Sequence, residues 1–262
     1  MTLTRDQIEQ AADLLAAADA DVTPIGQLTQ RYPGMDLADA YAIQQLNLAR
    51  RLATGRTLVG HKIGLTSRPM QNLLGVDEPD FGYILDSMVV PNGAAVRSGQ
   101  FCAPRVEPEV AFLLREPLCG PEVTIDDVRT ATEAVAVALE VVDSRIADWK
   151  LTLRDTVADN ASSGAVVLGD WVPYSQHVEL AAARASLWLN GTEADSGVGS
   201  AVLGDPAAAV AWLANALAPF GAKLSPGQFV MSGSFTTAAF VHPGDTATAT
   251  ISGLGTVSLT FT

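Results

Sequence analysis

The hydrophobic pattern of this 262-residue chain changes along its length, and the change limits the folds open to it. Over residues 1–55 apolar side chains recur at helical spacing. From residue 105 short runs alternate between apolar and polar residues, and only one long helix, at about 206–218, interrupts them. A doubly wound parallel sheet would need regular alternation of strands and helices, so we predict an α+β chain instead. Strands are expected at 57–65, 84–90, 105–114, 136–146, 163–172, 185–190, 228–234 and 246–261, with a turn at 77–82.

The N-terminal part carries clear helix signals. Thr4 followed by Gln7 is typical of a capping box, and a second helix is expected after Asp36. We therefore divide the chain into an N-terminal helical region, residues 1–57, and a β-rich domain, residues 58–262, which are expected to share one fused core.

Composition limits the kinds of partner that the chain is expected to bind and the cellular compartment in which it is expected. The chain has 16 Lys and Arg against 29 Asp and Glu, a net charge of −13, which argues against nucleic acid and anionic membranes as partners. Every long uncharged stretch contains helix-breaking residues, so none of them predicts a membrane span. The N-terminus lacks the apolar segment of a signal peptide, and Cys102 and Cys119 do not form a disulfide framework. We expect a cytoplasmic protein with reduced thiols.

Two glutamates in the segment RVEPEVAF are unusual. Side chains at i and i+2 share one face of a strand, so Glu107 and Glu109 point the same way. Adjacent carboxylates repel each other, and each is destabilised further by burial. Such a pair is explained either by a bound cation or by a solvated face, and the ExE pattern alone does not decide between them.

A third carboxylate, Glu140, stands alone in the apolar run VAVALEVV. A buried, unpaired carboxylate is costly and needs a metal, a cation or hydrogen-bond donors, although an edge strand or a salt bridge would also explain it. Three carboxylates without a nearby thiolate or imidazole form a hard, all-oxygen ligand set. If they meet, the set favours Mg²⁺ or Mn²⁺ and leaves coordination positions for substrate and water.

A lysine in the predicted strand 57–65 supplies a possible counter-charge. Lys62 lies between Gly60 and Gly64, which let backbone or ligand approach closely. Such a lysine either extends to solvent or pairs with an anion. His61 faces the opposite side of the strand and is interpreted as a structural or exposed histidine.

These segments together resemble the 2-hydroxypenta-2,4-dienoate hydratase family, also called 2-keto-4-pentenoate hydratases, in the fumarylacetoacetate hydrolase superfamily. The resemblance runs in order from residue 58 to the C-terminus. One small departure is Pro108, where relatives often carry Val or Ala; it leaves the carboxylates intact. The matching stretches include HKIGLTS (61–67), PRVEPEVAF (104–112), ALEVVDSRIADW (138–149), DTVADNASSG (155–164), VLGDPAAAVAWLAN (202–215) and GLGTVSLTF (253–261).

The resemblance implies a mixed β-roll or barrel with the N-terminal helices packed outside. It implies a Mg²⁺ or Mn²⁺ site, with Lys62 placing positive charge beside the substrate and Asp80 transferring protons. Asp80 has a competing interpretation as a turn residue in DEPDFG. The implied metal ligands are Glu107, Glu109 and Glu140, and the implied substrate-binding residues are Asp159, Asn160, Ser162, Ser163 and Ser234.

The implied reaction adds water to a 2-hydroxy-2,4-dienoate and gives a 4-hydroxy-2-oxoacid, as in meta-cleavage degradation of aromatic or steroid rings. The nearest alternative is 4-oxalocrotonate decarboxylase, whose members tend to lack an aspartate at the position of Asp80. Hydrolytic C–C cleavage is a further alternative, and it would need a histidine base. A homo-oligomer is expected. A non-catalytic subunit in a complex with a pathway decarboxylase or aldolase is also open, although such a subunit would be expected to lose one of the charged residues.

Overall fold

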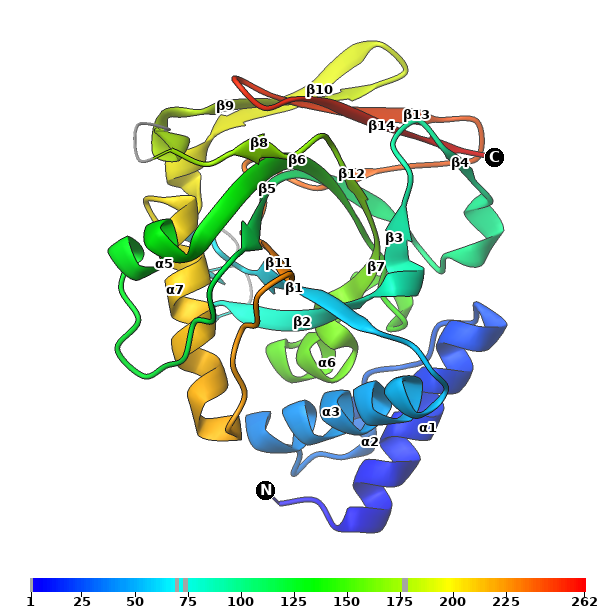
Figure 1. The fold of residues 1–262 in the computed structure, drawn as a ribbon. Coiled ribbons are helices and arrows are strands. Elements are labelled where there is room, and N and C mark those ends of the chain that lie inside the picture. The colour runs from blue at the N-terminus through cyan, green and yellow to red at the C-terminus, as the bar shows by residue number, and fades with distance from the viewer. Residues whose placement is uncertain (1, 69–70, 73–74, 176–178) are drawn as a thin grey trace.

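The computed structural model describes residues 2–262 except 69–70, 73–74 and 176–178. Helices lie mainly at the N-terminal end and strands build the body, so the α+β prediction is confirmed (Figure 1). The helices are α1 (Arg5–Asp21), α2 (Leu28–Arg31), α3 (Leu37–Ala53), α5 (Ile125–Ala131), α6 (Leu153–Ala158) and α7 (Pro206–Leu217). The strands are β1 (Leu58–Gly64), β2 (Asp80–Leu85), β3 (Val89–Val90), β4 (Ala95–Val96), β5 (Arg105–Leu114), β6 (Thr132–Val142), β7 (Ser163–Leu168), β8 (Val172–Pro173), β9 (Arg184–Leu189), β10 (Thr192–Val198), β11 (Phe229–Met231), β12 (Ala239–Phe240), β13 (Thr246–Ile251) and β14 (Gly255–Phe261).

The N-terminal helices begin where the capping residues predict. The Thr4 side chain accepts a hydrogen bond from the Gln7 backbone amide, and the Gln7 side chain accepts one from the Thr4 backbone amide. Asp36 and Asp39 form the same reciprocal arrangement at the start of α3. The buried face of α1 packs against α3, and α3 packs on α6 and the outer face of β2 (Figure 1).

A nine-stranded mixed sheet curls around a central axis and forms the body of the protein (Figure 1). Its main path is β2-β1-β11-β5-β6-β7-β3, with β12 on β5 and β8 on β6. The β1–β11 and β3–β7 pairs are parallel and the others are antiparallel. The longest pairing joins β5 to β6, from Arg105 opposite Val142 to Leu114 opposite Thr132. The predicted rolled mixed sheet is therefore confirmed.

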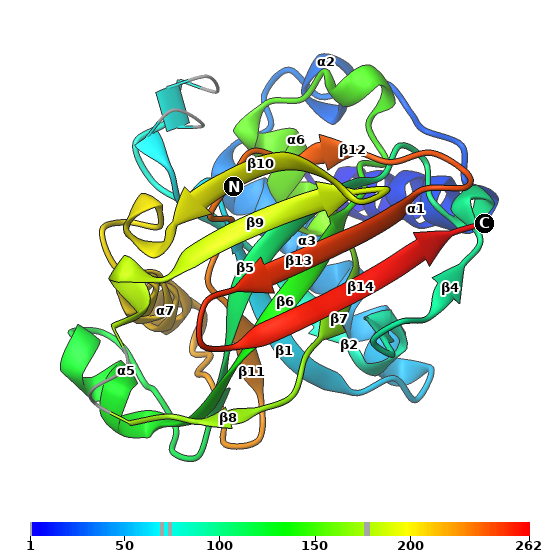
Figure 2. The ribbon, with the colours of Figure 1, turned by 90° about the horizontal axis from the view of Figure 1, so that it is seen from above.

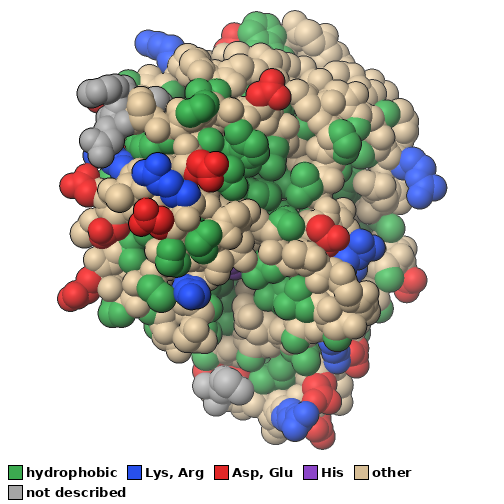
Figure 3. Space-filling view, viewed as in Figure 1, with side chains coloured by type: hydrophobic (Ala, Val, Ile, Leu, Met, Phe, Trp, Pro, Cys, Tyr) green, Lys and Arg blue, Asp and Glu red, His purple; other side chains and the backbone are tan. Residues whose placement is uncertain are grey.

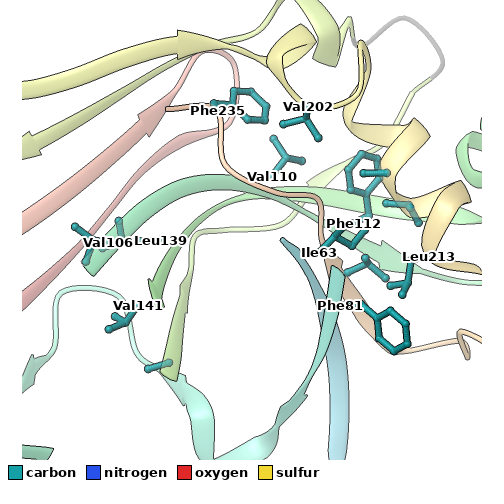
Figure 4. Close-up of a cluster of buried hydrophobic side chains, with 14 of the residues drawn as sticks. Ile63, Phe81, Val106, Val110, Phe112, Leu139, Val141, Val202, Leu213 and Phe235 are labelled. Atoms are coloured by element: carbon teal, nitrogen blue, oxygen red, sulfur yellow. The ribbon is translucent and has the colours of Figure 1, made fainter. Parts of the chain in front are cut away.

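A second sheet of five strands, in the order β10-β9-β13-β14-β4, covers the outer face of β5 and β6 (Figure 2). Alternation along β5 sends Val106, Val110 and Phe112 to the outer face of the sheet, where all three are fully buried. Figure 4 shows Val110 lying near Phe235 and Val202 in the apolar layer outside the curled sheet. This layer fixes which face of β5 is turned outward and which is turned into the barrel.

Helix α7 packs beside the barrel with most of its residues buried. The stretch Gly199–Phe220, which contains α7, is apolar and long enough to cross a membrane by length and composition, but half of it is buried inside the structure. On the face seen in Figure 3, charged side chains lie singly or in small mixed groups. These features are those of a core helix in a globular body.

Several predicted boundaries are wrong. The turn expected at 77–82 ends earlier, because residues from Asp80 onward pair with β1 as strand β2. The strand expected at 84–90 is divided by a short 3₁₀ turn at 86–88. The strand expected at 246–261 is a hairpin of β13 and β14. Strand β10 was not predicted, because its sequence TEADSGV has no apolar alternation.

Candidate metal centre

The three glutamates converge inside the barrel. Glu107 and Glu109 share the inner face of β5, and Glu107 pairs in register with Glu140 on β6. Carboxylate oxygens of the three residues lie within 4.8 Å of one another. Glu109 and Glu140 are each 1% exposed and Glu107 is partly exposed, so the cluster reaches solvent on the Glu107 side. The solvated-face explanation therefore does not apply to Glu109 or Glu140.

The cluster is electrostatically unfavourable by itself. Burial, together with the neighbouring carboxylate of Glu140, raises the pKa of Glu107 to about 7. Burial raises the pKa of Glu109 well above its usual range, and raises that of Glu140 against the opposing effect of Lys62. Neither side-chain oxygen of Glu140 accepts a hydrogen bond from the described residues. Hard carboxylate oxygens at this spacing, with both oxygens of Glu140 lacking a hydrogen-bond donor, fit a divalent cation such as Mg²⁺ or Mn²⁺.

Lys62 is the cation that faces the cluster. Its Nζ lies 3.5 Å from Glu140 Oε1 and donates a hydrogen bond of 3.0 Å to the carbonyl oxygen of Ala161. Burial lowers the pKa of Lys62, but the carboxylates of Glu140 and Asp80 outweigh this effect and leave the pKa above its ordinary value. Lys62 is therefore held as a charged ammonium group inside the barrel.

Asp80 lies next to Lys62 rather than in a turn. It begins β2 opposite Gly64 of β1 and is 2% exposed. A Cβ atom at Gly64 would lie 2.2 Å from Asp80 Oδ1 and 3.2 Å from Lys62 Nζ, so glycine makes room for both side chains. Burial raises the pKa of Asp80 and the charge of Lys62 opposes the rise. The interpretation of Asp80 as a turn residue is wrong.

The segment Asp159–Ser163 contacts the site mainly through its backbone. Asn160, Ala161 and Ser162 all have positive φ, between 50° and 54°, a conformation that is rare for residues other than glycine. Their left-handed turn directs the Ala161 carbonyl to Lys62. Strain of this kind persists only where surrounding contacts hold it.

Side chains of this segment supply those contacts. Asp159 Oδ1 accepts a 2.5 Å hydrogen bond from Arg145 Nε, and both residues are buried. The Asn160 amide bonds both backbone groups of Tyr83, at 2.8 and 3.0 Å. In the described structure these side chains are engaged by Arg145 and Tyr83, and the substrate-binding roles of Asp159 and Asn160 stay predictions. Sequence reasoning missed Arg145, which follows β6 and whose partners lie in the segment after α6.

The three predicted serines differ in their surroundings. Ser162 and Ser163 are buried beside the left-handed turn, and Ser162 Oγ lies 3.3 Å from Thr156 Oγ1. Ser234 Oγ donates to the Thr236 carbonyl at 2.9 Å and closes a local turn. The neighbouring Gly233 amide donates to Glu109 Oε2 at 2.8 Å, so the predicted 232–234 turn reaches the cluster through its backbone.

The far half of the barrel is filled with apolar side chains. The inward-facing residue after Glu109 on β5 is Ala111, and the one before Glu140 on β6 is Ala138. Both belong to a cluster that is at most 5% exposed. The polar side chains of the site therefore lie in the half of the barrel where β5 begins. The cluster consists of Ile84, Ala111, Ala138, Val166, Phe229 and Met231.

Comparison with known proteins agrees with this fold. The family model described as the fumarylacetoacetate (FAA) hydrolase C-terminal region matches residues 52–262. The chain therefore belongs to the fumarylacetoacetate hydrolase family.

Individual relatives show which members of that family the chain is similar to. The chain is 45% identical over 257 residues to the 2-hydroxyhexa-2,4-dienoate hydratase of Comamonas testosteroni, covering 97% of each chain. It is 40% identical over 259 residues to a 2-keto-4-pentenoate hydratase of Paraburkholderia xenovorans, covering 99% of this chain and 96% of the relative. A solved 4-oxalocrotonate decarboxylase of Pseudomonas putida, complexed with magnesium and adipate, superposes with a TM-score of 0.97 at 37% identity and covers 100% of this chain and 99% of its own.

Proposed function

We propose that this chain is a metal-dependent hydro-lyase that adds water to a 2-hydroxy-2,4-dienoate and releases a 4-hydroxy-2-oxoacid. The observation that carries the proposal is the convergence of three glutamates, two of them buried, beside a charged lysine and a buried aspartate. Hydratases of such dienoates are among its relatives at 40–45% identity over nearly the full chain. The natural setting is meta-cleavage degradation of aromatic or steroid rings, in the cytoplasm and as a homo-oligomer.

Glu107, Glu109 and Glu140 would hold the Mg²⁺ or Mn²⁺ ion. When bound, the ion supplies Lewis-acid chemistry to the carboxylate and C2 oxygen of the substrate. The Gly233 amide orients Glu109 by donating to one of its two oxygens. Glu140 accepts no hydrogen bond from the described part of the chain, and Lys62 Nζ lies 3.5 Å from its Oε1, so its Oε2 is the oxygen without a partner there.

Lys62 stabilises negative charge on the substrate. Its ammonium group is buried, which strengthens its interaction with a nearby anion, and the Ala161 carbonyl fixes its position. Ketonisation of a dienol moves negative charge onto the C1–C2 end before a proton is added further along the chain. A lysine fixed beside that end is arranged to favour this redistribution.

Asp80 moves the proton. Its Oδ1 has no hydrogen-bond partner among the residues described, and burial raises its pKa above the ordinary value against the opposing charge of Lys62. Protonation of the dienol at carbon gives a conjugated ketone whose C4 is electrophilic, and water then adds there. Asp80 would carry the 2-hydroxyl proton to C5, then take a proton from the attacking water and pass it to C3 of the enolate that the addition forms.

Decarboxylation of 4-oxalocrotonate is the second candidate, because a decarboxylase has nearly the same fold. It shares the metal chemistry but breaks a C–C bond. Hydrolytic C–C cleavage has less support. His61 is buried with its pKa lowered to about 4, and His242 is 77% exposed. His177 lies outside the described residues. A non-catalytic role has no support from the residues, because every charged group of the site is present.

The test is to supply freshly generated 2-hydroxypenta-2,4-dienoate and Mg²⁺ to the purified chain and follow the loss of dienoate absorbance. Hydration adds the mass of one water to the product. The same assay with 4-oxalocrotonate, scored for release of CO₂, separates the second candidate. If CO₂ is released while the simple dienoate is unchanged, the hydratase proposal is wrong.

A further inference from the structure

A cavity of about 200 Å³ lies outside the barrel, and no step of the proposed reaction uses it. Helices α1 and α3 form one wall of the cavity, and the outer face of β2, the end of α6 and the start of β7 form the other. Neither the three glutamates nor Lys62 or Asp80 is among the described residues that line it. The cavity is therefore separate from the glutamate cluster inside the barrel.

Tyr83 brings an unpaired hydroxyl group to this cavity. The residue is 8% exposed, and its hydroxyl group forms no hydrogen bond with the residues described. Burial raises the pKa of Tyr83, and the positive charges of Arg51 and Arg145 oppose the rise. The charges of Asp19 and Asp159 add to it, but each acts less strongly than either arginine. All four charged groups line the cavity, so together they make the electrostatic potential at the Tyr83 hydroxyl positive.

Both arginines have carboxylate partners, yet Arg51 keeps free donors. Arg51 Nη2 forms an ion pair with Asp19, and Nε and Nη1 of Arg51 donate no hydrogen bond to the described residues. The side-chain nitrogens of Arg145 bond Asp159 or the Ser163 carbonyl, so Arg145 contributes charge rather than a further contact. Donors beside a positive charge favour an anion, and a carboxylate can accept two such hydrogen bonds.

The apolar part of the wall limits the size and polarity of the ligand. It consists of Leu15, Ala16, Leu85, Met88 and Ala158. A dry apolar cavity of about 150 Å³ binds a six-carbon ring. The volume here, about 200 Å³, therefore suits a carboxylate with a short apolar tail, roughly six to nine non-hydrogen atoms in all.

We propose that this cavity binds a small aliphatic monocarboxylate. The carboxylate group accepts hydrogen bonds from the Tyr83 hydroxyl and from Arg51, and the tail packs against the apolar part of the wall. The inference goes beyond the proposed hydration and does not depend on it, because binding needs neither the metal nor the glutamates. Asn160 lines the cavity and also belongs to the left-handed turn that holds Lys62, so the ligand would lie against that turn.

The experiment titrates the metal-free full chain with pentanoate and measures the dissociation constant by ligand-observed NMR. Pentanamide, which has the same shape without the charge, is the comparison probe. We expect pentanoate to bind about 10-fold more tightly than pentanamide, and Tyr83→Phe and Arg51→Gln each to weaken pentanoate binding about 10-fold, as loss of a charged hydrogen bond predicts. Arg50→Gln is the matched control, because Arg50 lies next to Arg51 on α3 and pairs with Asp13 but does not line the cavity.

Lys62→Met shows whether the carboxylate binds inside the barrel instead, and this variant should bind pentanoate as tightly as the wild type does. Binding that is lost in Lys62→Met but kept in Tyr83→Phe would overturn the proposal. Equal affinity for the two probes, unchanged affinity in both cavity variants, or a dissociation constant above about 10 mM would do the same.

Thermal unfolding of each variant establishes that it is folded. Tyr83→Phe removes only the hydroxyl oxygen, so it keeps the test decisive if a larger change prevents folding. Because no measurement uses turnover, failure of the proposed hydratase function would leave the binding result unaffected.

Discussion

Lys62 Nζ donates a 3.0 Å hydrogen bond to the carbonyl of Ala161, a residue whose φ is 50°. The bond joins β1 to the left-handed turn that follows α6, and it directs a charged group toward Glu140. The position of the lysine therefore depends on a strained turn that the Arg145–Asp159 pair and Asn160 hold in place. Substitutions that destabilise the turn should therefore also lower activity at the glutamate cluster.

Removing one carboxylate of the cluster should abolish metal binding. Glu140→Gln is expected to weaken Mn²⁺ binding by about 100-fold or more, since even outer-shell partners of a metal contribute about 10–100-fold. Titration calorimetry with Mn²⁺ measures the affinity, and the dienoate assay measures activity. Glu133→Gln, at an exposed position of the same strand, should change neither. Unchanged Mn²⁺ affinity in Glu140→Gln would remove Glu140 from the ligand set.

Asp80→Asn should separate metal binding from turnover. Because the glutamates carry the metal, Mn²⁺ affinity should stay within a few-fold of the wild-type value, whereas kcat should fall by about 10²–10⁴-fold for loss of a positioned acid–base group. Asp77→Asn is the control, because Asp77 is exposed. Near-normal hydration by Asp80→Asn would show that the proton comes from another group.

Gly64→Ala should disturb Asp80 and Lys62 together. The added Cβ would lie 2.2 Å from Asp80 Oδ1, so at least one side chain must move. Overpacking of this kind typically destabilises by about 1–3 kcal/mol. The measurements are the free energy of unfolding in urea and the rate of hydration. The same substitution at Gly99, where a Cβ meets nothing within 4 Å, should have little effect on either. Equal behaviour of the two variants would contradict the crowding argument.

Arg145→Met should destabilise the protein strongly, because it leaves Asp159 buried without its partner. Breaking a buried ion pair in this way costs about 3–5 kcal/mol. The double variant Arg145→Met/Asp159→Leu should recover part of the loss, as a double-mutant cycle would measure. Lys150→Gln, in an ion pair whose side chains are 77% and 72% exposed, should cost less than about 1 kcal/mol. A loss no larger than that of Lys150→Gln would show that the pair does not hold the turn.

Stability should fall in mild acid because of His61. Burial lowers the pKa of His61 to about 4 from 6.5. Between these values the unfolded chain binds a proton that the folded chain does not, so the free energy of unfolding decreases as the pH falls from 6.5 toward 4. The largest effect is about 3 kcal/mol. His61→Gln should flatten this part of the pH profile, whereas His242→Gln, at a site 77% exposed, should not. Parallel profiles for wild type and His61→Gln would refute the assignment.

The sequence predicts those features that depend on short-range patterns. Capping residues locate α1 and α3, and alternation along β5 correctly places Glu107 and Glu109 on one face. Glu140 is identifiable because an acid in an apolar run needs a partner wherever the strand lies. The division into residues 1–57 and 58–262 stays a prediction, as do the roles of Ser162, Ser163 and Ser234.

What the sequence does not predict depends on partners distant in the chain. The segment at Asp80 contains turn residues, yet pairing with β1 makes it a strand. Asp159 and Asn160 are polar loop residues whose side chains are occupied by Arg145 and Tyr83, and nothing local reveals this. The contacts of Arg105 with the rings of Trp149 and Phe240 likewise come from two other segments, and nothing local reveals them.

The apolar cluster in the far half of the barrel leaves no room for a polar chain beyond Ala111 and Ala138. Under the proposed function, substrate, metal and the water to be added would therefore approach from the polar half, and product would leave by the same side. A seated substrate tail would then stand between the reacting carbons and bulk solvent. The attacking water would have to be inside before the tail is seated, so that hydration of the chamber would precede each turnover.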